Sequence, residues 1–214
     1  MNLYFYFKKI QNFFIDKKFS YPSVMMDFFS KNKKKTVVSF SSIGRGRKYI
    51  QQNEFFYLTQ KYNVLFIKDI TRSWFNNIDI KYFNTYLGKN TYAIGFSMGG
   101  FNAIIFSTLY PVKKVIAFSP QFSIHPNISK DKSFINFAAL IKNWKFTKLK
   151  FSKNTKYLLI FGDSDEEKYH MKMIPKKSNI KILVIKNCNH ETALFLKKKN
   201  MLKKIINNFF SKNN

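Results

Sequence analysis

The chain has 214 residues, of which 45% are hydrophobic and 23% charged. This composition is globular, which excludes wholesale disorder, and the length predicts a single domain over residues 1–214. One cysteine, Cys188, excludes an internal disulfide framework and any multi-cysteine metal site. We therefore expect neither a metal nor a cofactor.

The formal net charge is +27, from 38 basic and 11 acidic residues. Three of the basic residues are arginines (Arg45, Arg47 and Arg72), and the rest are lysines. Nucleic-acid recognition favours the planar guanidinium group, so nucleic acid is not an expected partner. Phe, Lys, Ile and Asn share A/T-rich codons and are all abundant, which favours genome composition over a selected anionic partner as the cause of the charge.

The N-terminal sequence MNLYFYFKKI has too short an apolar run for a signal peptide, and no small-residue cleavage site follows it. We therefore expect a cytoplasmic protein. The first 30 residues are aromatic and irregular, and they predict either an edge strand or a docking helix.

Six short apolar runs predict parallel strands that are covered on both faces. They alternate with segments of helical character, which predicts an α/β fold with a mostly parallel sheet of six or more strands, right-handed crossovers and helices on both faces. The predicted strands are residues 36–40, 63–68, 91–96, 114–118, 157–161 and 181–185. The predicted helices lie near residues 49–61, 79–86, 99–109, 133–143, 166–173 and 191–210.

Residues 90–112 carry no charge and are long enough to span a bilayer, but their Gly, Ser and Asn residues favour a strand, a turn and a buried helix instead. Residues 119–156 form the longest connection without a predicted strand. We expect this connection to contain a helix and to form a small cap over a site.

The sequence Gly95-Phe96-Ser97-Met98-Gly99 follows an apolar strand and opens a buried helix. G-x-S-x-G in this context is typical of a nucleophile elbow, a tight turn that projects a serine hydroxyl above the sheet. The turn leaves no room for side chains at Gly95 and Gly99. The alternative is a Gly-rich turn with an incidental serine.

A serine nucleophile needs a base, and the base needs a group that orients it. His190 follows the strand at 181–185, where an open α/β sheet places its site. Asp165 follows the strand at 157–161 and is the preferred acid, with Asp163 second because it suits hydrogen bonding within the turn. Either aspartate also suits a plain helix cap.

An oxyanion hole needs two N–H donors. Met98, the residue after the candidate nucleophile, is expected to supply one. Ser42, with Ser41 as the alternative, is expected to supply the other from the loop after the strand at 36–40.

The motifs SFSSIG, GFSMGG, GDSD and NCNH occur in this order between residues 36 and 210, and with them the chain resembles the α/β-hydrolase superfamily. More narrowly, FIKDITRSWF, GFSMGGFNAI and VIAFSPQFSI resemble small hydrolase-like proteins of bacterial surface-polysaccharide (capsule) genes. The resemblance implies acyl-enzyme chemistry, in which Ser97 attacks an ester, His190 moves the proton and Asp165 holds the imidazole.

The leading hypothesis is a serine esterase or deacylase that acts on a small-molecule or glycan ester, such as an acylated sugar, the sugar being implied by the resemblance alone. Arg72 and Trp74 follow the strand at 63–68 and are candidates for substrate binding, while a surface ion pair with Asp69 or another acid is the alternative for Arg72.

One alternative function is acyl transfer to an alcohol with the same residues. The other is a non-catalytic basic module for anionic membrane or glycan surfaces. The lysine-rich last helix could make a peripheral membrane contact through the apolar stripe Leu202, Ile205, Ile206 and Phe209, although such spacing is also typical of core packing.

Overall fold

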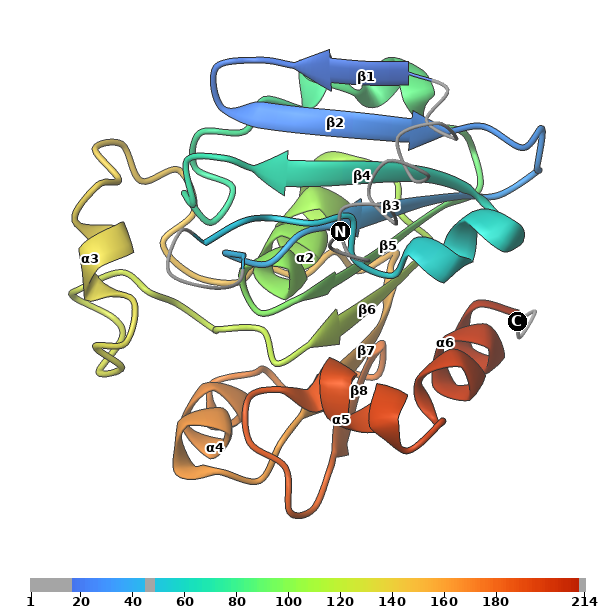
Figure 1. The fold of residues 1–214 in the computed structure, drawn as a ribbon. Coiled ribbons are helices and arrows are strands. Elements are labelled where there is room, and N and C mark those ends of the chain that lie inside the picture. The colour runs from blue at the N-terminus through green and yellow to red at the C-terminus, as the bar shows by residue number, and fades with distance from the viewer. Residues whose placement is uncertain (1–16, 45–48, 212–214) are drawn as a thin grey trace, which may run out of the picture.

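The computed structural model describes residues 17–44 and 49–211, which form one eight-stranded sheet with helices on both faces (Figure 1). The strands are β1 (Lys17–Ser20), β2 (Val24–Phe29), β3 (Thr36–Phe40), β4 (Asn63–Asp69), β5 (Thr91–Phe96), β6 (Lys114–Phe118), β7 (Lys156–Phe161) and β8 (Ile180–Val184). The α-helices are α2 (Met98–Leu109), α3 (Ile135–Ala138), α4 (Asp165–Lys172), α5 (Thr192–Lys198) and α6 (Leu202–Ser211). The described residues also form the 3-10 helices η1 (Phe56–Gln60), η2 (Ile80–Tyr82) and η3 (Asn84–Tyr86).

The strand order is β1-β2-β4-β3-β5-β6-β7-β8. All pairs from β4 to β8 are parallel, and the six strands predicted from apolar runs are the six that form this parallel part. β3, β5 and β6 are buried along their whole length because helices cover both faces of the sheet. The predicted mostly parallel sheet is confirmed.

The described part of the first 30 residues forms a hairpin of β1 and β2 at one edge of the sheet. β2 pairs antiparallel with β4, and β1 pairs antiparallel with β2. Of the two alternatives for this segment, the edge strand is therefore the one that the structure shows for residues 17–29, and residues 1–16 lie outside the described residues.

Neighbouring side chains of each strand point to opposite faces and build two cores. One core packs the sheet against α2, with Phe101 and Ile104 among its buried members. The other packs the opposite face against η1, α5 and α6, with Leu202, Ile206 and Phe210 buried. The apolar stripe of the last helix therefore serves core packing, and the structure does not leave it as a free membrane-docking face.

Several predicted helices are shorter than expected. Within residues 49–61 the structure has only the 3-10 helix η1. The residue before it, Phe55, has a left-handed conformation with φ 58°. The long final helix is divided into α5 and α6 at Asn200, where φ is also 58°. The apolar spacing was helical in both places, but the chain turns so that each piece packs on the sheet.

Residues 119–155, here called the β6–β7 segment, contain only the short helix α3. This segment lies at the carboxyl ends of the parallel strands, on the left of Figure 1. Its place is the one predicted for a cap, and its role in covering a substrate stays a prediction.

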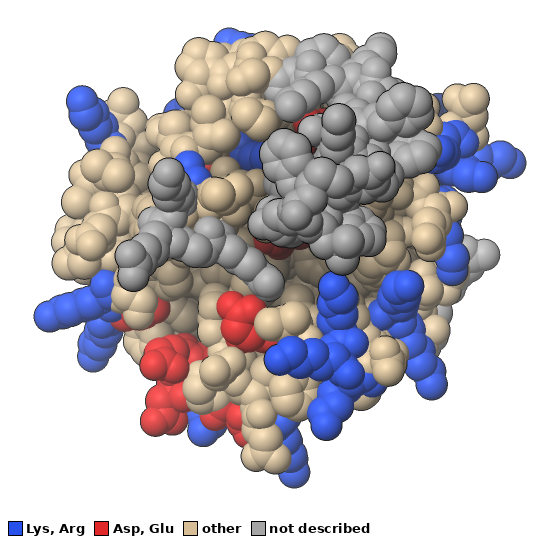
Figure 2. Space-filling view, in the orientation of Figure 1, with Lys and Arg blue, Asp and Glu red and all other residues tan. Residues whose placement is uncertain are grey.

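Figure 2 shows acidic side chains gathered over α4, while basic side chains extend from the region of α5 and α6.

Within the described ranges, no helix combines the length and the apolar character needed to cross a bilayer. The uncharged stretch at residues 90–112 is divided between β5 and α2, as expected.

Candidate active site

Ser97 lies between the end of β5 and the start of α2. Its backbone angles are φ 56° and ψ −124°, an unfavourable conformation for a residue with a side chain. The Ser97 N–H donates to the carbonyl of Phe118 on the neighbouring strand at 2.8 Å, which helps to hold the turn. This is the tight strand–turn–helix geometry that the motif predicted.

Two glycines make this turn possible. A Cβ atom at Gly95 would lie 2.1 Å from the carbonyl oxygen of Gly99, and one at Gly99 would lie 2.2 Å from that of Phe40. Both distances are far below van der Waals contact with backbone that cannot move aside. The Gly requirement read from the motif therefore has a direct steric cause.

His190 reaches Ser97 from the loop after β8. Its Nε2 atom lies 2.9 Å from Ser97 Oγ, although the two residues are 93 positions apart in the chain. The imidazole packs beside the ring of Phe96, with centroids 5.2 Å apart. The structure thus brings together the serine and the histidine that the sequence paired.

The carboxylate that contacts His190 is that of Glu167, which lies 2.8 Å from the imidazole Nδ1. Asp165, predicted at this position, has a fully exposed side chain that lies 3.6 Å from the ammonium group of Lys168. This corrects the sequence prediction. Successive residues of a helix point about 100° apart, so the side chains at the start of α4 diverge and that of Glu167 turns inward.

Asp163, the second choice, contacts backbone rather than the imidazole. Its two carboxylate oxygens accept from the N–H groups of Asn187 and Cys188 at 2.9 and 3.1 Å. These hydrogen bonds lower the pKa of Asp163, because they stabilise the charged form. Asp163 therefore shapes the turn, which is the role that the sequence analysis preferred for it, and fixes the loop that ends at His190.

Glu167 is held from a second side. Its Oε2 atom accepts from the N–H of Gly162 at 3.0 Å, and its side chain is only 2% exposed. Sequence reasoning missed this residue, although one signal was present. Ser164 caps α4, because its side chain accepts from the Glu167 N–H. A serine followed three residues later by glutamate is typical of a helix N-terminus, and such a cap fixes the residue at which the helix begins.

The expected oxyanion donors differ in their availability. The N–H of Met98 is at the first position of α2, where no helix carbonyl accepts from it. The N–H of Ser41 is committed to the carbonyl of Ile67 at 2.9 Å, so it is not a donor for a ligand. The N–H of Ser42 donates to the carboxylate of Glu54 at 3.0 Å, and its hydroxyl contacts the same oxygen.

Arg72 does not have either of its predicted roles. Its guanidinium donates to the carbonyls of Ile43, Ile70 and Tyr49, so it braces neighbouring loops instead of facing a substrate. The alternative ion pair is also absent, because Asp69 is buried and accepts from Thr71, Ser73 and Phe75.

Trp74 was expected to line a pocket but is fully buried. Its indole N–H donates to the side-chain oxygen of Gln121 at 3.1 Å, and the amide nitrogen of Gln121 lies 3.1 Å from Ser97 Oγ. Trp74 is thus connected to Ser97 through Gln121. Gln121 belongs to the motif VIAFSPQFSI, and its role was not predicted from the sequence.

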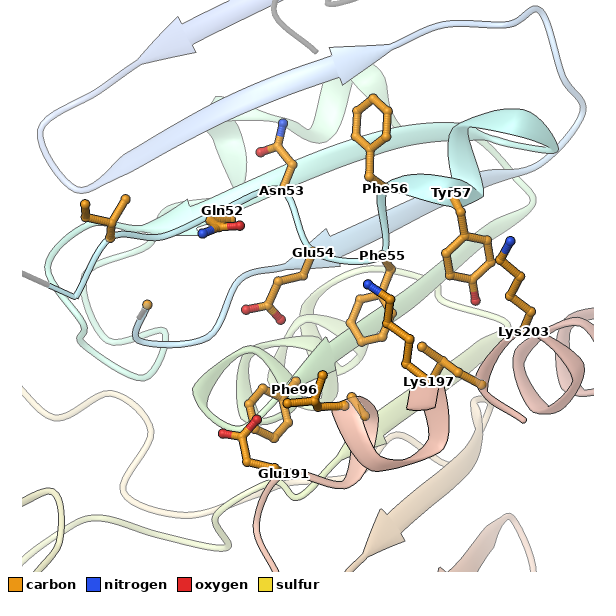
Figure 3. Close-up of a pocket in the computed structure, with 15 residues that line it drawn as sticks. Gln52, Asn53, Glu54, Phe55, Phe56, Tyr57, Phe96, Glu191, Lys197 and Lys203 are labelled. Atoms are coloured by element: carbon orange, nitrogen blue, oxygen red, sulfur yellow. The ribbon is translucent and has the colours of Figure 1, made fainter. Parts of the chain in front are cut away.

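A cavity of about 480 Å³ lies on the α5 side of the site, next to Phe96 (Figure 3). The carboxylates of Glu54 and Glu191 lie near Phe96, whereas Lys197 and Lys203 lie at the end near Tyr57. The cavity therefore carries both acidic and basic side chains, and two of its lining residues, Phe96 and Glu191, are the chain neighbours of Ser97 and His190. Within the described residues, no cluster of three or more His, Cys, Asp or Glu side chains is placed to hold a metal ion.

Comparison with known proteins gives structural matches only. No family model and no curated protein matches the sequence. The capsule O-acetyltransferase of Neisseria meningitidis serogroup A matches with a TM-score of 0.61 and 17% identity, over 88% of this chain and 93% of that one. An alpha/beta hydrolase fold protein from Chitinophaga pinensis matches with a TM-score of 0.59 and 7% identity, over 92% and 97%. The carboxylesterase CesB from Bacillus subtilis matches with a TM-score of 0.53 and 12% identity, over 95% of each chain.

These matches show that the protein has the α/β-hydrolase fold, as the resemblance implied. The fold is shared by hydrolases and by an O-acetyltransferase, and it supports either kind of acyl chemistry. Fold alone does not determine the reaction, which has to be argued from the site.

Proposed function

We propose that this protein is a serine esterase or deacylase that works through an acyl-enzyme on Ser97. The observation that supports this most directly is the continuous line of hydrogen bonds from Ser97 through His190 to Glu167, with spacings of 2.9 and 2.8 Å. A hydroxyl, an imidazole and a buried carboxylate in this order are the parts that serine acyl-transfer enzymes require.

In the proposed reaction, Ser97 Oγ attacks the ester carbonyl while its proton passes to His190 Nε2. The bond from Oγ to the acyl carbon forms, the carbonyl electrons move to oxygen, and the C–O bond to the leaving alcohol then breaks as His190 returns the proton to that alcohol. Water then attacks the acyl carbon while His190 Nε2 takes a proton from it, and the bond from the acyl carbon to Oγ breaks as His190 returns the proton to Ser97, which releases the carboxylic acid. Glu167 holds the imidazole and stabilises its positive charge.

The oxyanion would be stabilised by the N–H groups of Met98 and Ser42. In the structure a Glu54 oxygen takes the hydrogen bond of the Ser42 N–H. The proposal therefore requires Glu54 to give up this contact when the substrate oxygen arrives.

An acylated sugar or glycan precursor is the proposed substrate class. The cavity next to Phe96 is lined by the carboxylates of Glu54 and Glu191, and carboxylates accept hydrogen bonds from sugar hydroxyls. The fold match to an enzyme whose name describes acetyl transfer to capsule agrees with such a substrate.

Transfer of the acyl group to a sugar hydroxyl instead of water is the second candidate. It is favoured by the structural match to that O-acetyltransferase and by the same cavity. Both candidates use the same three side chains and differ only in the acceptor that reaches the acyl-enzyme.

The test is covalent labelling by a fluorophosphonate probe, followed by a panel of esters that includes O-acetylated sugars. We expect the native protein to be labelled and Ser97→Ala to lose all labelling while it keeps its thermal unfolding temperature. Free acetate as the product would indicate hydrolysis, and an acetylated acceptor would indicate transfer. Absence of labelling, together with salt-sensitive binding to anionic surfaces that survives in Ser97→Ala, would support the basic binding module instead.

A further inference from the structure

Gln121 lies just after β6 and is buried, with 1% of its surface exposed. Its amide lies between two buried groups, the indole of Trp74 and the hydroxyl of Ser97, at 3.1 Å from each. Ser97 Oγ therefore has two nitrogen neighbours: Nε2 of Gln121 and Nε2 of His190.

The indole fixes which way the amide faces. Trp74 Nε1–H is a donor only, so the group of Gln121 that faces it must be the oxygen. The NH₂ group then faces Ser97, where it is a donor only. Ser97 Oγ must accept this hydrogen bond, and one of its lone pairs is used.

The carboxylate fixes the other end of the line. Glu167 Oε2 already accepts from the Gly162 N–H, and Oε1 faces the imidazole Nδ1. A carboxylate that accepts at both oxygens places a hydrogen on Nδ1, so the neutral imidazole presents an unprotonated Nε2 to Ser97. The Ser97 hydrogen then points to His190.

We propose that Gln121 is a catalytic residue that donates to Ser97 Oγ and directs the Ser97 hydrogen to His190 before substrate binds. This inference rests on the proposed acyl-enzyme function and adds a residue to it. The hydrogen bonds run in one direction, from Trp74 to Gln121, Ser97, His190 and Glu167.

The surroundings of Gln121 hold it firmly in place. The next residue, Phe122, donates its N–H to His170 Nδ1 on α4 at 3.3 Å and accepts from the Leu149 N–H at 2.8 Å. The Trp74 ring packs against Phe134 of the same segment, with centroids 5.3 Å apart. The amide is thus fixed from both sides, which a directing role requires.

Two substitutions separate this role from simple packing. Gln121→Glu keeps the shape and an acceptor for Trp74, but the introduced carboxylate accepts from Ser97 and turns its hydrogen away from His190. Gln121→Met removes the donor and keeps the volume. We expect fluorophosphonate labelling to slow about 10-fold in Gln121→Met and about 100-fold in Gln121→Glu. Because a buried carboxylate also lowers stability, the thermal unfolding temperature of both variants is measured as well: a packing role predicts slower labelling only where that temperature falls.

A second readout does not depend on activity. The chain has three histidines, so the ¹⁵N resonances of His190 can be assigned by comparison with His190→Ala. We expect the Nε2 resonance to move downfield in Gln121→Glu, where it loses the hydrogen bond from Ser97, and to stay in place in the exposed-site control Asp165→Asn. An unchanged Nε2 resonance in Gln121→Glu would overturn the inference.

If the native protein is not labelled at all, the proposed function fails. The ¹⁵N spectrum of His190 still decides the direction of the hydrogen bond between Ser97 and His190 in that case.

Discussion

The turn at Ser97 and the first turn of α4 both follow a parallel strand at the carboxyl edge of the sheet, yet only the first could be interpreted residue by residue. At the Ser97 turn, each position has its own steric condition, because Cβ atoms at Gly95 and Gly99 would collide with backbone. At the start of α4, three acids follow one another, Asp165, Glu166 and Glu167, and local geometry accepts any of them.

The difference shows where sequence information about a site lies. A position that must lack a side chain is visible in the residue type itself. A position that must face a partner from a distant loop depends on helix phase and on the path of that loop. Glu167 meets both conditions, and Asp165, two residues earlier, points into solvent.

The largest expected effect tests this choice among the acids. Glu167→Gln should slow labelling and ester turnover by about 10³-fold, because the amide cannot accept from both Gly162 and the imidazole and so favours the wrong tautomer of His190. The matched control Asp165→Asn should change the rate by less than about twofold, since its side chain is fully exposed. The reverse ranking, measured by probe labelling and steady-state kinetics, would restore the original sequence prediction.

The steric condition at the Ser97 turn can be tested in the same way. Gly99→Ala would place a methyl group 2.2 Å from the Phe40 carbonyl oxygen and should lower the free energy of unfolding by about 2–4 kcal/mol. Gly88→Ala is the control, because nothing lies within 4 Å of its Cβ position, and it should change stability by less than about 0.5 kcal/mol. Equal stability of the two variants in urea unfolding would contradict the steric account.

The smallest expected effect concerns the contact between α4 and the β6–β7 segment. Asp131 accepts from His170 at 3.1 Å, and this hydrogen bond lowers the pKa of Asp131 below its ordinary value of 3.8. Because the folded-state pKa is lowered, the contact contributes stability above the ordinary pKa and loses it as the pH falls further.

Asp131→Asn should therefore lower the free energy of unfolding by about 1 kcal/mol at about pH 7, after allowance for solvent screening, and the difference from the native protein should shrink below about pH 3. Unfolding in urea at both pH values measures it. A difference that is equally large in acid would mean that the Asp131 carboxylate is not the source of the stability.

Much of the fold was accessible from local patterns. The apolar runs predicted all six strands of the parallel part, because strands buried on both faces have to be apolar throughout. The segment at residues 49–61 shows the limit. Its apolar residues have helical spacing, but Phe55 adopts a left-handed conformation and only residues 56–60 form a helix, of the 3-10 type. Packing on the sheet decided this conformation, and packing is not part of the local pattern.

The residues of the candidate site also fall into two groups, those predicted from local sequence and those identified only in the structure. Ser97 and His190 followed from a motif and from chain order, whereas Gln121 and Glu167 did not. The Ser164 cap indicated only how Glu167 lies in its helix, and no local pattern marked Gln121. The groups opposite their side chains identify both residues: an imidazole for Glu167, and an indole and a hydroxyl for Gln121.

The sequence by itself determined the parallel sheet, the strained serine turn and the histidine loop, because each depends on steric or burial conditions that act within a few neighbouring residues. Only the tertiary structure decided which carboxylate meets the imidazole, that Arg72 braces loops, and that an amide from another strand end reaches the serine hydroxyl. Hydrogen bonds of this kind join groups that are tens of residues apart, and their geometry exists only once the sheet has assembled and brought the strand ends together.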